Sequence, residues 1–164
     1  MSDVDRHYYQ SHSLTLALHP SETEERMMIR LLAFALNASD DLAFGRGLST
    51  EEDAALWRKD LTDQIQLWID VGLPDDKRVK KASQRSDAVQ IYSYGERTAP
   101  IWWEQNRKKI QAYDNIQVYY VTPDTCAGLV SLCERTMHLH CNIMDGEINL
   151  GNDNNSITVQ LQHW

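Results

Sequence analysis

The sequence lacks several features that would assign it to a familiar class of protein. Its three cysteines, Cys126, Cys133 and Cys141, form no Cys-x-x-Cys pair, which is typical of reduced thiols in the cytosol and not of a disulfide framework. No apolar run approaches the roughly 20 residues that a membrane-spanning helix needs. The N-terminal MSDVDRHYYQ is polar and acidic, unlike a signal peptide, and P-loop, Gly-x-Ser-x-Gly and dinucleotide-binding motifs are absent. These absences predict a cytoplasmic protein with no contact to a membrane.

Positive charge is also scarce. Lysine and arginine together number 16, against 24 aspartates and glutamates, so the formal net charge is −8. This balance argues against strong non-specific binding of nucleic acid, which depends on neutralising phosphates, although it is compatible with a local basic groove. With 164 residues, 42% hydrophobic and 24% charged, the chain has the size and composition of one compact globular domain.

The segment HPSETEERMMIRLLAFALNA predicts the clearest helix. Ser21 suits the N-cap position, and Glu24 three residues later completes a capping box. Apolar residues then recur at helical spacing. Before this helix, residues 13–18 predict a short strand. After it, AFGRGLS is either a short strand or a loop, and EEDAALWRK is either a helical turn or a strand.

The centre of the chain alternates strands and helices. IQLWIDV predicts a buried strand with its odd-numbered apolar residues on one face and Gln66, Trp68 and Asp70 on the other. Gly72 ends this strand, and a helix that begins with acids and continues with bases follows to about Arg85. AVQIYSYG and NIQVYYVT predict two further strands. IWWEQNRKKIQA and TPDTCAGLVSLCER predict two further helices, the second with Thr122 as its N-cap.

The C-terminal segment MHLHCNIMDGEINLGNDNNSITVQLQHW has a different pattern. Its residues alternate, and Asp145-Gly146 and NDNN are turn signals, which predicts an antiparallel three-stranded meander. The fold class is therefore α/β (α+β). We expect one compact domain in which helices flank a mixed β-sheet, followed by the C-terminal antiparallel meander.

Several blocks of the sequence carry a family resemblance. They are HPSETEERMMIRLLAFAL, GRGLS, LWIDVGLPDDKRVKKA, IWWEQN, ERTM and DGEI, and they are spread over nearly the whole chain. Together they resemble the bacterial YaeQ family. The resemblance implies a variant of the PD-(D/E)XK nuclease fold, a restriction-endonuclease-like mixed sheet with its site at one edge of the central strands. Family members begin with an extra strand before MSDVDRHYY, so residues 1–164 are expected to form a single YaeQ-like domain that lacks this strand.

The implied fold cleaves phosphodiester bonds with Mg²⁺ or Mn²⁺ held by carboxylates. Asp70 is the first candidate ligand. Asp60, ten positions earlier, could approach it if LTDQ forms the turn of a hairpin. Glu24 and Glu25 of the first helix are candidates for a further carboxylate, Glu25 with a catalytic role as well. Alternatively, Asp70 accepts backbone hydrogen bonds, Asp60 is an exposed turn residue, Glu24 serves only the capping box, and Glu25 is a surface charge.

The same chemistry needs a cation near the carboxylates to stabilise the charge that develops in the transition state. The usual lysine lies two positions after the acid, but that position here is Gly72. The resemblance implies that the following helix supplies it instead, and Lys80 and Lys81 are the candidates. Alternatively, these lysines belong to a solvent-exposed face of the helix, where Asp76 and Lys80 form an ion pair on the surface.

Gln66 weighs against catalysis. It shares a strand face with Asp70, and related sequences tend to carry an acid there. A neutral amide binds a hard cation less well than a carboxylate.

Two hypotheses for the function follow. The first is a metal-dependent nuclease or phosphodiesterase. The second is a catalytically degenerate domain that binds nucleic acid or a partner protein through the same cleft, and it predicts Asp70 in a salt bridge to lysine or arginine.

Overall fold

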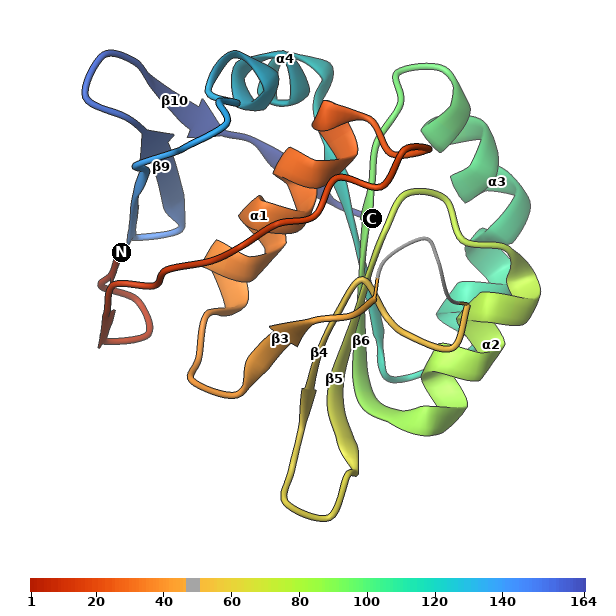
Figure 1. Ribbon diagram of the computed structural model, residues 1–164. Coiled ribbons are helices and arrows are strands. Elements are labelled where there is room, and N and C mark those ends of the chain that lie inside the picture. The colour runs from red at the N-terminus through yellow and green to blue at the C-terminus, as the bar shows by residue number, and fades with distance from the viewer. Residues whose placement is uncertain (47–50) are drawn as a thin grey trace.

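Two sheets and two helical layers alternate through the molecule. The computed structural model describes residues 1–46 and 51–164, and within these it contains four helices and two mixed sheets. Figure 1 shows α1 and α4 between the sheets and α2 and α3 on the far side of the larger one. The helices are α1 (Glu24–Asn37), α2 (Asp76–Arg85), α3 (Thr98–Gln111) and α4 (Pro123–Ser131). The predicted fold class, a mixed α+β domain, is confirmed.

The larger sheet has six strands in the order β11-β7-β6-β5-β4-β3. They are β3 (Leu42–Phe44), β4 (Leu56–Lys59), β5 (Ile65–Val71), β6 (Ser86–Ser93), β7 (Ile116–Val121) and β11 (Leu161–His163). The central strands β5, β6 and β7 are parallel, and β3, β4 and β11 are antiparallel to their neighbours. Two segments were ambiguous in the sequence. EEDAALWRK (51–59) ends in strand β4, and AFGRGLS (43–49) begins in strand β3, while its residues 47–49 lie outside the described part.

Strand β5 divides the core into two clusters, as its alternating pattern predicts. Leu67, Ile69 and Val71 pack on α1 and α4, whereas Trp68 packs on α2 and α3. Both faces of a central strand are covered, so every residue from Leu67 to Val71 is buried. Asp70 belongs to the Trp68 face and is only 5% exposed. The carboxylate therefore lies between the sheet and α2.

Helix α1 begins differently from the prediction. Its N-cap is Thr23, whose hydroxyl accepts a hydrogen bond from the backbone N–H of Arg26, so the capping box of Ser21 and Glu24 is wrong. The chain is instead held there by Glu22, which is buried and bonded to Arg30. The two hydrogen bonds from Arg30 to the buried Glu22 stabilise this arrangement more than a cap by the exposed Ser21 would.

The predicted strand over residues 13–18 is also wrong. This segment is extended and runs alongside α1 without a sheet partner (Figure 1). A side chain holds it in place, because Nη2 of Arg30 donates to the carbonyl oxygen of Ala17 at 3.0 Å.

The smaller sheet confirms the predicted meander. Strands β8 (His140–Met144), β9 (Glu147–Gly151) and β10 (Ser156–Val159) are antiparallel neighbours. Two short N-terminal strands that the pattern did not indicate extend it: β1 (Ser2–Asp3), parallel to β8, and β2 (Tyr8–Tyr9).

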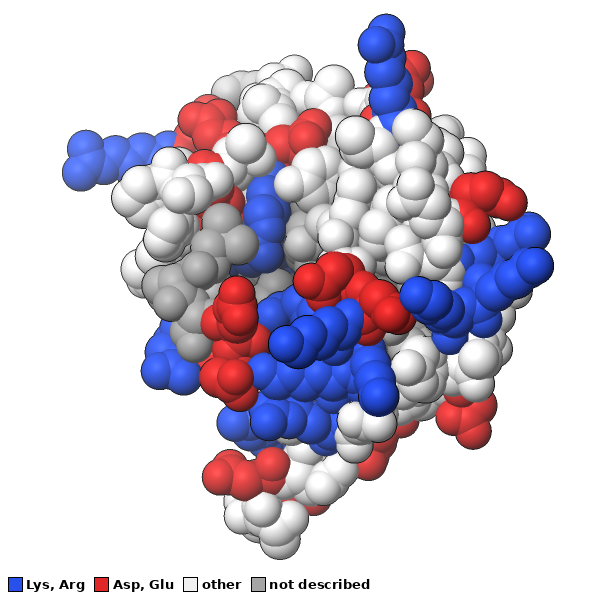
Figure 2. Space-filling view, turned by 90° about the vertical axis from the view of Figure 1, so that its right-hand side faces the viewer, with Lys and Arg blue, Asp and Glu red and all other residues white. Residues whose placement is uncertain are grey.

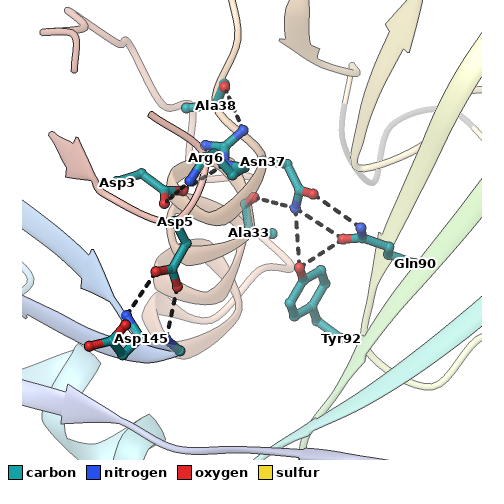
Figure 3. Close-up of polar contacts among 10 residues, drawn as sticks. Asp3, Asp5, Arg6, Ala33, Asn37, Ala38, Gln90, Tyr92 and Asp145 are labelled. Atoms are coloured by element: carbon teal, nitrogen blue, oxygen red, sulfur yellow. Dashed lines mark hydrogen bonds and ion pairs between the residues drawn. The ribbon is translucent and has the colours of Figure 1, made fainter. Parts of the chain in front are cut away.

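Polar contacts join the sheets to α1 (Figure 3). Asp5 accepts bonds from the backbone N–H groups of Asp145 and Gly146, both at 2.8 Å, and so ties the N-terminus to the meander turn. At the end of α1, the amide of Asn37 bonds Gln90 and the hydroxyl of Tyr92 on β6. The Asn37 bonds join the end of α1 to the larger sheet.

Candidate functional site

The end of β5 and the first turn of α2 form the candidate site. Gly72 adopts a φ of 115°, which lets the chain turn sharply out of the sheet. Asp75 is the N-cap of α2, and its side chain accepts the backbone N–H of Arg78 at 2.8 Å. Because helical side chains point back towards the N-terminus, this cap directs Arg78 towards the end of the strand that precedes it.

Arg78 forms a two-pronged ion pair with Asp70. Its Nε and Nη2 lie 2.8 Å from Oδ2 and Oδ1 of the carboxylate. The guanidinium also lies over the ring of Trp68, 5.5 Å from its centroid. Burial would by itself lower the pKa of Arg78, but the hydrogen bond and charge of Asp70 raise it above the ordinary value. The raised pKa keeps the Arg78 guanidinium positively charged beside the carboxylate.

The lysines expected near Asp70 lie elsewhere. Lys80 is exposed, and Nζ of Lys81 lies 2.9 Å from the Glu52 carboxylate. Glu52 also pairs with Arg85 at 3.2 Å. The cation that the structure brings to Asp70 is thus Arg78. A capped helix start with arginine in its first turn was the signal in the sequence that could have identified it.

The other candidate carboxylates do not join Asp70. Asp60 lies in the β4–β5 turn, at the opposite end of β5, and its Oδ1 accepts bonds from Thr62 and from the backbone of Gln64. Glu24 and Glu25 form the first turn of α1. Burial raises the pKa of Cys126 to about 12, and the charge of nearby Glu25 adds to this effect, so Glu25 lies towards α4.

The residues present do not fit a magnesium or manganese site of the expected kind. Extending the β4–β5 register by one position from Leu56 opposite Ile69 places Ala55 opposite Asp70, so the neighbouring strand offers no carboxylate there. Both oxygens of Asp70 already accept bonds from a guanidinium. Over residues 1–46 and 51–164, no three histidines, cysteines or acids are grouped so that they could hold a metal ion.

A second buried acid near the site was missed by sequence reasoning. Asp53 is 6% exposed, and its carboxylate accepts bonds from Nε, Nη2 and the backbone N–H of Arg46. The side-chain bond to Arg46 holds the pKa of Asp53 below its ordinary value. Its carbonyl oxygen, in turn, accepts from Arg78 at 2.9 Å.

A cationic face lies outside this buried pair. All six lysines of the chain are on β4, α2 and α3: Lys59, Lys77, Lys80, Lys81, Lys108 and Lys109. We call these six and Arg85 the cationic face. Figure 2 shows such side chains gathered on this side of the molecule, with acids between them. Among the described residues, Lys77, Lys80 and Lys108 have no ion-pair partner, whereas Lys109 pairs with Asp76 at 3.1 Å.

The fold and the site together define a mixed α+β domain with a buried carboxylate–guanidinium pair beneath a lysine-rich surface. None of the described helices is both long enough and apolar enough to span a membrane. The sequence pattern of the family described as YaeQ protein matches residues 1–161. The chain belongs to the YaeQ family.

Relatives and solved structures agree with this assignment. The uncharacterized proteins YaeQ of Escherichia coli (strain K12) and Salmonella typhi are each 42% identical over 164 residues, covering 100% of this chain and 91% of theirs. The crystal structure of YaeQ from Xanthomonas axonopodis pv. citri is 44% identical with a TM-score of 0.94, covering 99% of this chain and 92% of that one. YaeQ from Pseudomonas syringae is 37% identical with a TM-score of 0.93, covering 99% and 89%.

Proposed function

We propose that this chain is a catalytically degenerate nuclease-fold domain that binds nucleic acid through its cationic face without cleaving it. The two-pronged Asp70–Arg78 pair carries the argument against hydrolysis, because it uses both oxygens of the acid that cleavage would need. A salt bridge at Asp70 is also what the degenerate alternative predicts. Of the two hypotheses, the geometry supports this one best.

The distribution of lysine supports nucleic acid as the ligand. The chain carries a formal net charge of −8, yet all its lysines lie in residues 59–109, on three adjoining elements. Lys77 and Lys80 are exposed on α2 and have no acid within ion-pair distance among the described residues. Lysines without a protein partner are available to displace counterions from phosphates, which is the main source of affinity in non-specific binding.

Binding across a salt series tests the proposal. Fluorescence anisotropy with labelled single- and double-stranded DNA and RNA should give a Kd in roughly the micromolar range at physiological salt, and a weaker affinity as salt rises. The variant Lys77→Ala/Lys80→Ala should bind more weakly, and its salt slope should fall by about 1–2 because two phosphate contacts are lost. Arg135→Ala, which removes an exposed arginine outside the cationic face, is the matched control and should bind like the wild type.

The same samples test for cleavage. Incubation of each oligonucleotide with Mn²⁺ should leave it intact. Cleavage that depends on Mn²⁺ and disappears in Asp70→Asn would instead support the metal-dependent nuclease. If the wild type binds none of the four nucleic acids at low salt, the proposal fails, and a partner protein becomes the ligand to seek.

A further inference from the structure

Trp57 is an aromatic residue that reaches the surface beside the lysines of the cationic face. It lies on β4 directly opposite Trp68 of β5, so both side chains are on the sheet face that α2 and α3 cover. Trp68 is fully enclosed there. Trp57, one strand nearer to the edge of the sheet, is only partly buried. Part of its indole ring is therefore in contact with solvent.

A lysine amine covers this ring. Nζ of Lys59 lies over the Trp57 ring, 3.8 Å from its centroid. Lys59 has no ion-pair partner among the described residues, so the ring is the main contact of its charge. Cation–π contacts at exposed sites are weak, which means that the amine can leave the ring at little cost. The ring itself is held in place by Trp68, at 5.9 Å between centroids and with the planes 83° apart.

A fixed aromatic ring beside a movable amine suits a single-stranded nucleic acid. Unpaired bases stack on aromatic side chains, and this contact tolerates any sequence because every base has a π face. The phosphates on either side of the base attract lysines. Bases in a duplex are stacked on one another and do not offer their faces to a side chain, so a duplex can use only the lysines.

We infer that a base of single-stranded nucleic acid stacks on Trp57, an inference that rests on the nucleic-acid binding proposed above. The base takes the place of the Lys59 amine on the ring, and the amine moves to an adjacent phosphate. Lys77 and Lys80 of α2 bind the backbone further along the strand. Trp57 thus gives the cationic face a contact to bases that its lysines do not provide.

Two single strands of equal charge test this inference on the wild type. One is a short oligothymidylate, and the other is a sugar–phosphate chain of the same length without bases. Fluorescence anisotropy at one salt concentration should show that the abasic strand binds roughly 5–100-fold more weakly, because it cannot stack. We call this ratio of affinities the base preference.

Variants locate the stacking contact. Trp57→Leu keeps an apolar side chain but removes the aromatic face, so it should lose the base preference, while its binding to a duplex and its salt slope stay unchanged. Trp57→Phe should retain part of the preference. Lys59→Ala should keep the preference, but its salt slope should fall by about 1 because a phosphate contact is lost. Trp103→Leu is the matched control. It removes another partly buried tryptophan, which packs on Trp164, and should bind like the wild type.

The outcomes separate this inference from the proposed function. Equal binding of the two strands by the wild type, or an unchanged base preference in Trp57→Leu, overturns stacking on Trp57 but leaves binding through the cationic face intact. If the wild type binds neither strand and no duplex, both proposals fail. If circular dichroism shows that Trp57→Leu is unfolded, the wild-type ratio and Trp57→Phe decide.

Discussion

Four buried acids among the described residues pair with an arginine, namely Asp3, Glu22, Asp53 and Asp70. The sites of Glu22 and Asp70 are the most alike. Arg30 bonds both oxygens of Glu22, at 2.6 and 3.0 Å, as Arg78 does with Asp70. Each guanidinium also lies over an aromatic ring, Phe44 or Trp68, at 5.7 and 5.5 Å. Each donates as well to a backbone carbonyl of an irregular segment. Arginine suits this task because its planar fork has five donors.

The sites differ in access to water. The side chain of Arg30 is 5% exposed, that of Arg78 is 28% exposed, and that of Arg46, which pairs with buried Asp53, is 72% exposed. Water can solvate a charge in proportion to its exposure when its partner is removed. The same pair of residue types is thus fully enclosed at Glu22–Arg30 and reachable by water at Asp70–Arg78. Substituting the three acids should give effects in the same order.

The largest effect is expected at the most buried pair. Glu22→Gln should reduce the free energy of unfolding by about 3–5 kcal/mol, because it leaves the charge of Arg30 in the core without a counter-charge. Urea denaturation measures this value. Glu24→Gln, in the exposed first turn of α1, is the matched control and should change it little. A loss of less than about 1 kcal/mol in Glu22→Gln would contradict the role of burial in the comparison.

A smaller effect is expected at Asp70. Asp70→Asn should reduce the free energy of unfolding by about 1–3 kcal/mol, because Arg78 keeps two carbonyl partners and some contact with water. Asp76→Asn removes an exposed acid of the same helix and is the control. If Asp70→Asn proves more costly than Glu22→Gln in urea denaturation, exposure of the arginine does not decide the difference between the two sites.

The smallest effect on stability is expected at Asp53, and it can be measured from the dependence of stability on pH. The side-chain bond to Arg46 lowers the pKa of Asp53. A carboxyl group with a lower pKa in the folded state contributes stability above its unfolded pKa and loses it as the pH falls through the folded pKa. Below about pH 4 the wild type should therefore lose stability more steeply than Asp53→Asn. Thermal melts from pH 6 downwards measure this, and parallel curves for the two proteins would contradict it.

Much of the fold followed from local patterns. Strand β5 shows its two faces in the alternation of apolar residues with Trp68 and Asp70, and the meander shows its turn at Asp145-Gly146. Thr122 caps α4 as predicted. In each case the structure depends on contacts between residues close in sequence, or on buried residues that recur at the regular spacing of a strand. Strands β1 and β2, two residues each, carry no such period, and their partners lie far along the chain.

The candidate site was predicted only in part. Its location at Asp70 before a capped helix came from the sequence, but the choice of cation did not. Four basic residues lie in the first one and a half turns of α2, and spacing alone does not tell which of them reaches back to the strand. The N-cap bond from Asp75 and the carbonyls of Glu51 and Asp53 select Arg78. The prediction of Ser21 as a cap failed for a similar reason, since Glu22 is drawn into the core by Arg30.

The sequence by itself determined the alternation of strands and helices from β5 to α4, the two faces of β5, the turn after it and the family to which the chain belongs. These depend on local propensity, on periodic burial and on long matching blocks. Only the tertiary structure decided that Asp70 is paired with an arginine, that no second carboxylate faces it, and that the lysines of three elements share one surface. Those properties depend on which segments meet in space. The role of Asp70 is decided by the side chain that the fold places next to its carboxylate, which is that of Arg78.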